Sequence, residues 1–216
     1  MIFGMPLDLF ILRIPAILIA LTFHEFAHGW VAYRFGDRTA YHNGRLTLNP
    51  IAHLDPIGSL LLLFTFFGWA KPVPVDPRNF SRLRWGIVMV SLAGPLSNVL
   101  LALVFGNVLN YFTIHNLAVD QHLQEFLYLL VMINLGISFF NLLPIPPLDG
   151  SNIMLGILPR KAIPRYLSLT RYVPMIFIGM LIMQSVLRRP VLSMVLGPLY
   201  IPYFHFFKAI TGWSFL

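Results

Sequence analysis

Residues 9–33 decide the fold and read LFILRIPAILIALTFHEFAHGWVAY. The stretch is apolar apart from a few polar positions, and its length suits an α-helix that crosses a bilayer at a tilt. A secretory signal peptide would begin with a basic region and have a shorter apolar core, so we expect the stretch to be retained. The sequence therefore predicts a membrane protein whose first helix spans the bilayer.

The composition excludes an ordinary soluble domain. Of the 216 residues, 57% are hydrophobic and 11% are charged, whereas soluble domains are about one quarter charged. The net charge of +7 does not predict nucleic-acid binding, because the Lys and Arg residues flank apolar runs and do not form a polar binding face. The chain has no Cys, so any metal must be held by His, Asp or Glu.

Further apolar runs predict further helices. Residues 85–111 and 126–143 are long enough to span, while 59–69 is short and suits a re-entrant segment. Residues 172–187 and 191–207 hold one or two weaker spans. We therefore expect an all-α polytopic membrane protein with about five to six transmembrane or re-entrant helical segments.

One membrane-embedded domain is expected over 1–216, with a catalytic core of about 9–150 and C-terminal helices at about 172–211. Lys and Arg are concentrated in 34–45, 71–84 and 160–171, and none occurs in 113–124. Because basic loops stay in the cytoplasm, this pattern predicts a multi-pass protein of the cell (cytoplasmic) membrane. The topology of the C-terminal end stays open, because Arg188-Arg189 fits the pattern less well.

The first helix carries His24-Glu25-Phe26-Ala27-His28, the pattern HExxH. Residues four apart lie on one helical face, so both imidazoles can bind one metal, with Glu25 beside them to take a proton from metal-bound water. Each ionisable side chain deep in a span costs about 2.5–3.5 kcal/mol, which a bound cation would offset. The alternative is a pair of helix-packing histidines, with Glu25 paired to Arg13 or another buried cation. His24 lies roughly 22 Å along a hydrocarbon core about 30 Å thick, so the site is expected inside the membrane, nearer its cytoplasmic face.

A catalytic zinc site needs three protein ligands and one open position. Asp149 follows the inward-running helix 126–143 and three prolines, on the same side of the membrane as the two histidines. It is the candidate third ligand. An ordinary surface turn at Asp149-Gly150 is the alternative, and spacing alone does not choose between them.

Two distant motifs resemble a known family. The HExxH motif, together with NLLPIPPLDG at 141–150, looks like the paired signature of site-2 proteases, the M50 class of intramembrane metalloproteases. The segments AGPLSN at 93–98 and GWAKPVPV at 68–75 are also similar to segments of compact prokaryotic members, and the resemblance covers most of 20–150.

The resemblance implies that His24, His28 and Asp149 bind one Zn²⁺ per chain and that Glu25 is the general base. It also implies that Asn141 lies near the site and steadies the substrate or the oxyanion. Family members cleave transmembrane segments of other proteins, as in regulated intramembrane proteolysis. Transmembrane proteins and the lipid bilayer are therefore the expected partners, and the oligomeric state is not predicted.

Other features are less specific. Residues 44–50 resemble the family's short re-entrant β-hairpin, with a plain surface turn as the alternative. Many family members carry a PDZ or CBS domain that selects or regulates the substrate. We expect no room for either in this chain, which leaves the choice of substrate open. His53 suits a hydrogen-bonded loop histidine, with a gating or supporting role near the metal as the alternative.

Rival functions are a metal-ion transporter, since intramembrane His, Asp and Glu also mark ion pathways, and an inactive membrane scaffold. A transporter would have polar groups along the whole bundle. Here they gather at one depth.

Overall fold

The computed structural model describes residues 6–65, 70–187, 191–213 and 215, and within these ranges it contains helices and no strand. The α-helices are α1 (Leu7–Arg34), α2 (Thr39–His42), α3 (Pro56–Thr65), α4 (Leu83–Ile114), α5 (Gln121–Leu142), α6 (Asp149–Ile157), α7 (Ile163–Thr170), α8 (Val173–Leu187) and α9 (Val191–Thr211). Two short 3₁₀ helices, η1 (Pro50–His53) and η2 (Pro77–Asn79), lie in the connection between α2 and α4.

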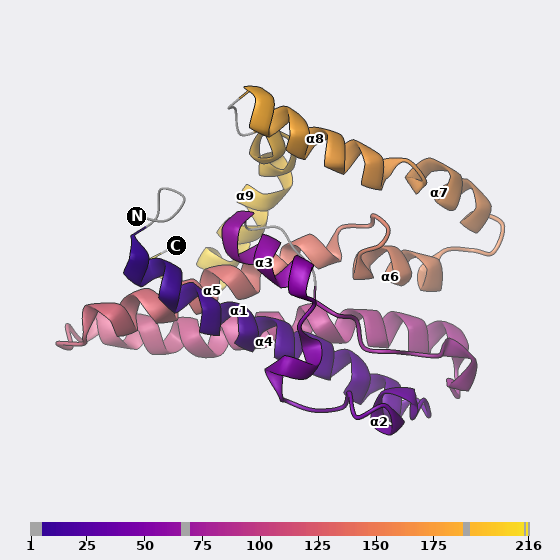
Figure 1. Ribbon diagram of the computed structural model, residues 1–216, viewed down its shortest axis with the longest axis horizontal. Coiled ribbons are helices and arrows are strands. Elements are labelled where there is room, and N and C mark those ends of the chain that lie inside the picture. Colours follow the sequence, from indigo (N-terminus) through magenta and orange to yellow (C-terminus); the bar gives the residue numbers. More distant parts are fainter. Residues whose placement is uncertain (1–5, 66–69, 188–190, 214, 216) are drawn as a thin grey trace.

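Helices α1, α4 and α5 lie side by side and form the centre of the molecule (Figure 1). Between them, Ala16 of α1 packs with Leu109 of α4 and with Leu127 and Leu130 of α5. Small residues allow this close approach, because a helix side chain without bulk lets a neighbouring backbone come near. The central layer therefore fixes the relative positions of three segments that are far apart in sequence.

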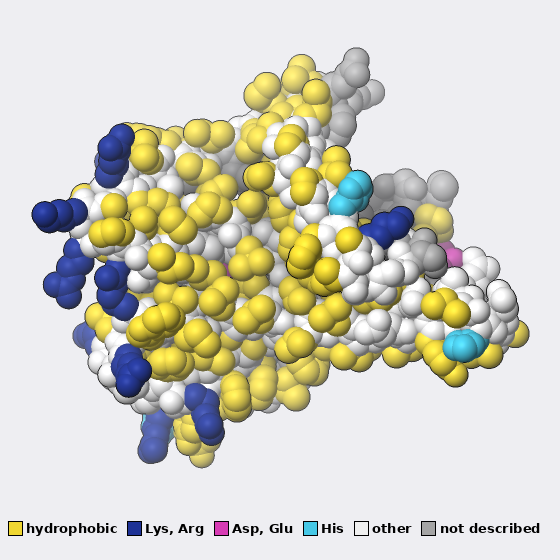
Figure 2. Space-filling model, turned by 180° about the vertical axis from the view of Figure 1, so that it is seen from behind, with side chains coloured by type: hydrophobic (Ala, Val, Ile, Leu, Met, Phe, Trp, Pro, Cys, Tyr) yellow, Lys and Arg dark blue, Asp and Glu magenta, His cyan; other side chains and the backbone are white. Residues whose placement is uncertain are grey.

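The same three helices are long and apolar enough to cross a membrane, the only ones to meet that measure among the described residues. Much of their outer surface is apolar, and Leu100 and Val104 of α4 are 63% and 57% exposed. Figure 2 shows this hydrophobic surface, with most of the visible Lys and Arg side chains gathered at one end. A bilayer is the solvent that suits such a surface, so the chain is a membrane protein.

The C-terminal helices lie on one side of this layer. Helix α9 packs on the centre through Phe207, and Trp213 just beyond it is fully buried there. Helix α8 contacts α9 and extends away from α1, α4 and α5 (Figure 1). Helix α8 is shorter than a usual span, and α9 contains Pro198 and Pro202. The expected count of five to six membrane segments thus remains a prediction beyond these three helices.

The structure does not contain the β-hairpin expected at 44–50, where turns and bends occur. At the end of this stretch, two amides bond to nearby side chains. Thr47 Oγ1 accepts a 3.1 Å hydrogen bond from the Asn49 amide, and Asn49 Oδ1 accepts one of 3.1 Å from the Ile51 amide. Helix α3 accounts for the start of the expected re-entrant run 59–69, and residues 66–69 lie outside the described residues.

Candidate metal site

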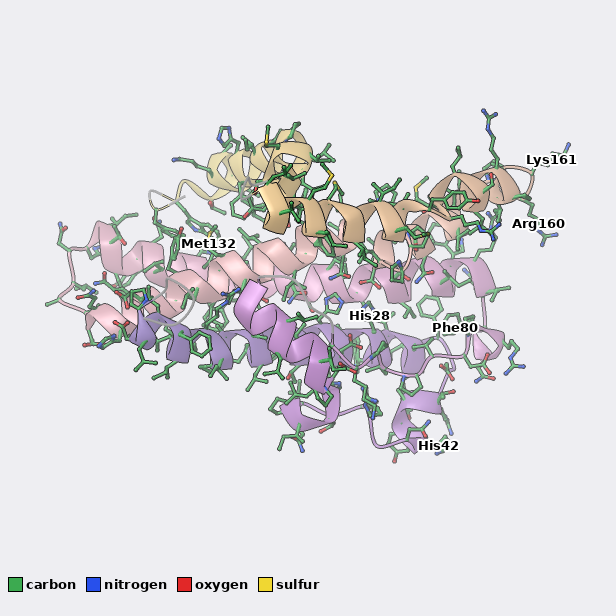
Figure 3. All side chains as sticks on the ribbon, turned by 45° about the horizontal axis from the view of Figure 1, so that its top comes forward. His28, His42, Phe80, Met132, Arg160 and Lys161 are labelled. Carbon is green, nitrogen blue, oxygen red and sulfur yellow. The ribbon has the colours of Figure 1, made fainter. Side chains whose placement is uncertain are left out.

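Three ionisable side chains from two elements meet inside the molecule. His24 Nε2 and His28 Nε2 lie 3.0 Å apart on α1, and each is 3.3 Å from Asp149 Oδ2 at the start of α6. His24 and His28 are spaced four residues apart, so their imidazoles share one face of α1. Figure 3 shows His28 among the helices at the centre of the molecule. The structure thus brings together the three residues expected to be metal ligands.

Gly150 allows Asp149 to reach this position. A Cβ atom at Gly150 would overlap the carbonyl oxygens of Leu142 and Leu143, and would lie 2.6 Å from the carbonyl carbon of Leu142. The start of α6 is therefore packed directly on the end of α5. The residue after Asp149 must be a glycine for the carboxylate to return to α1.

Gly94 of α4 makes room for the two imidazoles. A Cβ atom there would lie 2.6 Å from Cε1 of His28 and 2.7 Å from Cε1 of His24. Real Cβ atoms essentially never show contacts this short. The surface of α4 at Gly94 is therefore the surface against which both imidazoles lie.

The second nitrogen of each imidazole is held by α4. His28 Nδ1 lies 2.7 Å from the main-chain oxygen of Val90, which can only accept, so Nδ1 is the donor. His24 Nδ1 lies 2.7 Å from Asn98 Oδ1. Metal-binding histidines usually donate their other N–H in this way, which fixes the tautomer and the ring orientation.

Two buried asparagines determine the direction of the bond to His24. Asn98 Nδ2 donates to Ala20 O at 3.0 Å and to Asn134 Oδ1 at 2.8 Å, so its oxygen faces His24. Asn134 Nδ2 in turn donates to Leu130 O at 2.8 Å. Both asparagines are fully buried. This network joins α1, α4 and α5, and it leaves His24 with its proton on Nδ1.

Both Nε2 atoms therefore carry a lone pair toward the Asp149 carboxylate, and three acceptors face one another at 3.0–3.3 Å. Asp149 Oδ2 is buried and has no hydrogen-bond partner among the described residues. Ligands about 2.0–2.1 Å from a tetrahedral metal lie roughly 3.3 Å from one another. The donor set and its spacing therefore fit Zn²⁺, which would resolve this unfavourable meeting of lone pairs.

Glu25 is buried beside these ligands, and its Oε2 accepts a 2.8 Å hydrogen bond from the Val73 amide. Asn141 is partly buried, and its Nδ2 donates 3.0 Å to Ile137 O in its own helix. Its expected role near the site remains a prediction. His53 is buried and makes a 2.8 Å bond to Thr47 O, which agrees with a hydrogen-bonded loop histidine.

Sequence reasoning gave Asn98 no role of its own, although a signal was present. An Asn deep in an apolar span is costly and usually finds a polar partner. A second group with metal-ligand spacing, Asp8, His122 and Glu125, is exposed at two of its three positions. It lacks the burial and the oriented imidazoles of the first group.

Residues 105–184 match the family model described as Peptidase family M50. A Bacillus subtilis protein named "Putative zinc metalloprotease YwhC" is 44% identical over 158 residues, which cover 71% of this chain and 72% of that protein.

The "Putative zinc metalloprotease Rip2" of Mycolicibacterium smegmatis is 36% identical over 148 residues, 65% of this chain and 55% of that protein. The chain thus spans about half the length of Rip2. The "Zinc metalloprotease MJ0392" of Methanocaldococcus jannaschii is 26% identical over 145 residues, 67% of this chain and 34% of that protein. No solved structure matches the chain. The family match and the similarity to YwhC over most of both proteins lead to one conclusion: the chain belongs to peptidase family M50.

Proposed function

We propose that this chain is an intramembrane zinc endopeptidase of the site-2 protease type, which cleaves transmembrane segments of other membrane proteins. The observation that carries the proposal is the meeting of His24 Nε2, His28 Nε2 and Asp149 Oδ2 at 3.0–3.3 Å, with Glu25 next to His24 in the sequence. Family membership and the relatives' names as zinc metalloproteases support it.

His24, His28 and Asp149 would hold the metal and leave one position open for water or substrate. Zn²⁺ at such a site lowers the pKa of water to about 7 and polarises a carbonyl group as a Lewis acid. The Val73 amide donates a hydrogen bond to Oε2 of Glu25. The other carboxylate oxygen, Oε1, would accept the proton. Glu25 takes one proton from the attacking water and gives it to the leaving amide nitrogen. The hydroxyl of the water ends on the carbonyl carbon, so one water is consumed for each peptide bond cleaved.

The substrate must lose helical structure before it is cleaved. In a transmembrane helix each carbonyl oxygen is engaged in a main-chain hydrogen bond, because the bilayer core offers no other donor. Substrates with helix-breaking residues near the cleaved bond are therefore expected to react faster. Asn141 is proposed to steady the unwound segment or the oxyanion.

The cytoplasmic side is proposed for the end of α1 and the start of α4. Lys and Arg gather at one end of the molecule (Figure 2), and Arg160 and Lys161 extend outward at the turn between α6 and α7 (Figure 3). Because basic loops remain in the cytoplasm, the metal site would lie inside the bilayer and nearer that face. We infer a location in the cell membrane from the same asymmetry.

The test uses the full chain in proteoliposomes with a model transmembrane peptide. Glu25→Gln keeps the size of the side chain but removes its basicity, so cleavage should fall at least about 100-fold while bound zinc is retained. Cleavage at the wild-type rate in Glu25→Gln would refute the proposed mechanism. Zn²⁺ flux without peptide cleavage would favour a transporter, and neither flux nor cleavage would favour an inactive scaffold.

A further inference from the structure

Asp37 is a fully buried carboxylate that no step of the proposed reaction uses. It follows the end of α1, is 0% exposed, and is surrounded by donors. Asp37 Oδ1 accepts from the Thr39 amide at 3.0 Å, from Thr39 Oγ1 at 2.5 Å and from Asn79 Nδ2 at 2.9 Å. Asp37 Oδ2 accepts a 2.8 Å bond from the Asp76 amide. The last bond ties the end of α1 to a segment that is distant in sequence.

That segment, residues 71–76, runs without regular secondary structure beside α1. Pro72 and Pro74 have no N–H group, so few donors remain, and three of them bind near α1. The Lys71 amide donates 2.9 Å to His53 O, the Val73 amide donates 2.8 Å to Glu25 Oε2, and the Asp76 amide donates to Asp37. The segment is therefore fastened at separate points along its length, and Arg45 Nη2 adds hydrogen bonds of 2.8 Å to Lys71 O and 3.3 Å to Pro72 O.

The stretch of α1 from Glu25 to Ala32 and the segment from Val73 to Asp76 have matching lengths. The Asp37 amide folds back to Ala32 O at 3.0 Å, so Asp37 is held near Ala32. From Glu25 to Ala32 the helix rises roughly 10.5 Å. From Val73 to Asp76 an extended chain covers about 10 Å. Bonds at Glu25 and at Asp37 thus hold the segment at two points with matching separation.

Side-chain packing between these points supports the alignment. A Cβ atom at Gly29 would lie 3.3 Å from Val73 Cγ1, so Val73 lies against α1 one turn after Glu25. Val75 packs on the cluster of Ala32, Phe80 and Val90. The segment therefore follows α1 from Glu25 toward its C-terminal end.

We propose that Asp37 is a positioning residue for Glu25: by holding the Asp76 amide, it keeps the segment 71–76 aligned with α1 and presents the Val73 N–H to the Glu25 carboxylate. This inference rests on the proposed function, in which Glu25 carries the proton. A Glu side chain has several rotatable bonds, and a fixed donor restricts them to one orientation. Orientation of a catalytic group is a direct contribution to rate.

Asp37→Asn is the sharpest variant, because it replaces one acceptor oxygen by an NH₂ group of nearly the same size. If the remaining oxygen faces Thr39 and Asn79, the NH₂ meets the Asp76 N–H, and two donors oppose each other. Asp55→Asn is the matched control: Asp55 also accepts backbone hydrogen bonds, from Ile57 and Gly58 at 3.1 and 2.8 Å, but it does not bind the segment.

The experiment compares purified full-length variants in detergent by amide hydrogen exchange of residues 71–76, bound zinc, kcat and KM. In Asp37→Asn the Val73 and Asp76 amides should exchange faster, and kcat should fall about tenfold, the loss expected for one hydrogen bond to a charged group. KM and zinc content should stay as in the wild type, because no metal ligand is touched. Asp55→Asn should match the wild type in all four measurements.

Unchanged exchange at Val73 in Asp37→Asn would overturn the proposal, and so would faster exchange with wild-type kcat. A parallel loss of zinc would also overturn it, because Asp37 would then support the whole site. If Asp37→Asn does not fold, Val73→Pro removes the N–H that Asp37 is proposed to present to Glu25. It should give the same fall in kcat with zinc retained, and a wild-type kcat in Val73→Pro would overturn the proposal. If the wild type binds zinc but cleaves no peptide, the proposed function fails, while the exchange comparison still decides whether Asp37 fixes the Val73 amide.

Discussion

Asn98 Oδ1 accepts a 2.7 Å hydrogen bond from His24 Nδ1, while the two N–H bonds of the Asn98 amide donate to Ala20 O and Asn134 Oδ1. This arrangement leaves Asn98 only one way to face the imidazole. His24 is therefore presented with its Nε2 lone pair toward His28 and Asp149. A polar network that is fully satisfied is stable inside an apolar bundle, whereas removal of one member leaves buried groups unpaired.

Asn98→Ala should weaken zinc binding by about 10- to 100-fold, the usual cost of losing a partner that orients a ligand. The measurement is competition for zinc with a chelator of known affinity. Asn107→Ala on the same helix is the control, because Asn107 accepts a 3.1 Å bond from Trp213 Nε1, away from the site. Equal zinc affinity in Asn98→Ala and Asn107→Ala would show that Asn98 does not orient His24.

Gly94→Ala should abolish zinc binding, because the added methyl group would enter the space of both imidazoles. Zinc content after purification checks this directly. Gly136→Ala is the control: it lies on α5, and an added Cβ would meet nothing within 4 Å. A Gly94→Ala protein with one zinc per chain would mean that the histidines can move away from α4.

Asp37 should make stability depend on pH in acid solution. Burial acts to raise the pKa of the Asp37 carboxyl, but hydrogen bonds from Thr39, Asn79 and the Asp76 amide outweigh it and hold the pKa below its ordinary value. The unfolded chain then binds a proton more readily than the folded one. The resulting stabilisation is present above the unfolded pKa of about 3.9 and is lost as the pH falls through the lower folded value.

Thermal unfolding of metal-free protein from pH 6 to pH 3 measures this effect without contributions from zinc release. The wild type should lose more stability over the acid part of this range than Asp37→Asn, which has no carboxyl to protonate at that position. If the stability of the two proteins fell equally with pH, the lowered pKa of Asp37 in the folded protein would be contradicted.

Much of the central fold was predictable from the sequence. Long apolar runs predicted α1, α4 and α5, because a span needs a length of about 20 residues. Each helix begins and ends within about five residues of the predicted bounds. The HExxH spacing predicted that His24 and His28 share a face. Topology made Asp149 the candidate third ligand, with a surface turn as the alternative, and the structure places its carboxylate beside both histidines. The role of these three residues as zinc ligands remains a prediction.

Other features depend on tertiary contacts that no local pattern shows. The structure has turns and bends at 44–50, so the hairpin was wrong and the alternative of a surface turn agrees with it. The Asn98–Asn134 pair joins residues on separate helices, and Asp37 binds Asp76 across 39 positions. Short polar residues such as Asn and Asp at these places look like ordinary caps or packing residues until their partners are known.

Zinc stoichiometry of the purified full chain tests the central claim most directly, when wild type is compared with Asp149→Ala and Asp8→Ala. The wild type and Asp8→Ala should each hold one zinc per chain. Asp149→Ala should hold little or none, because only two neutral imidazoles remain. A full zinc complement in Asp149→Ala, or its loss in Asp8→Ala alone, would contradict the site formed by His24, His28 and Asp149.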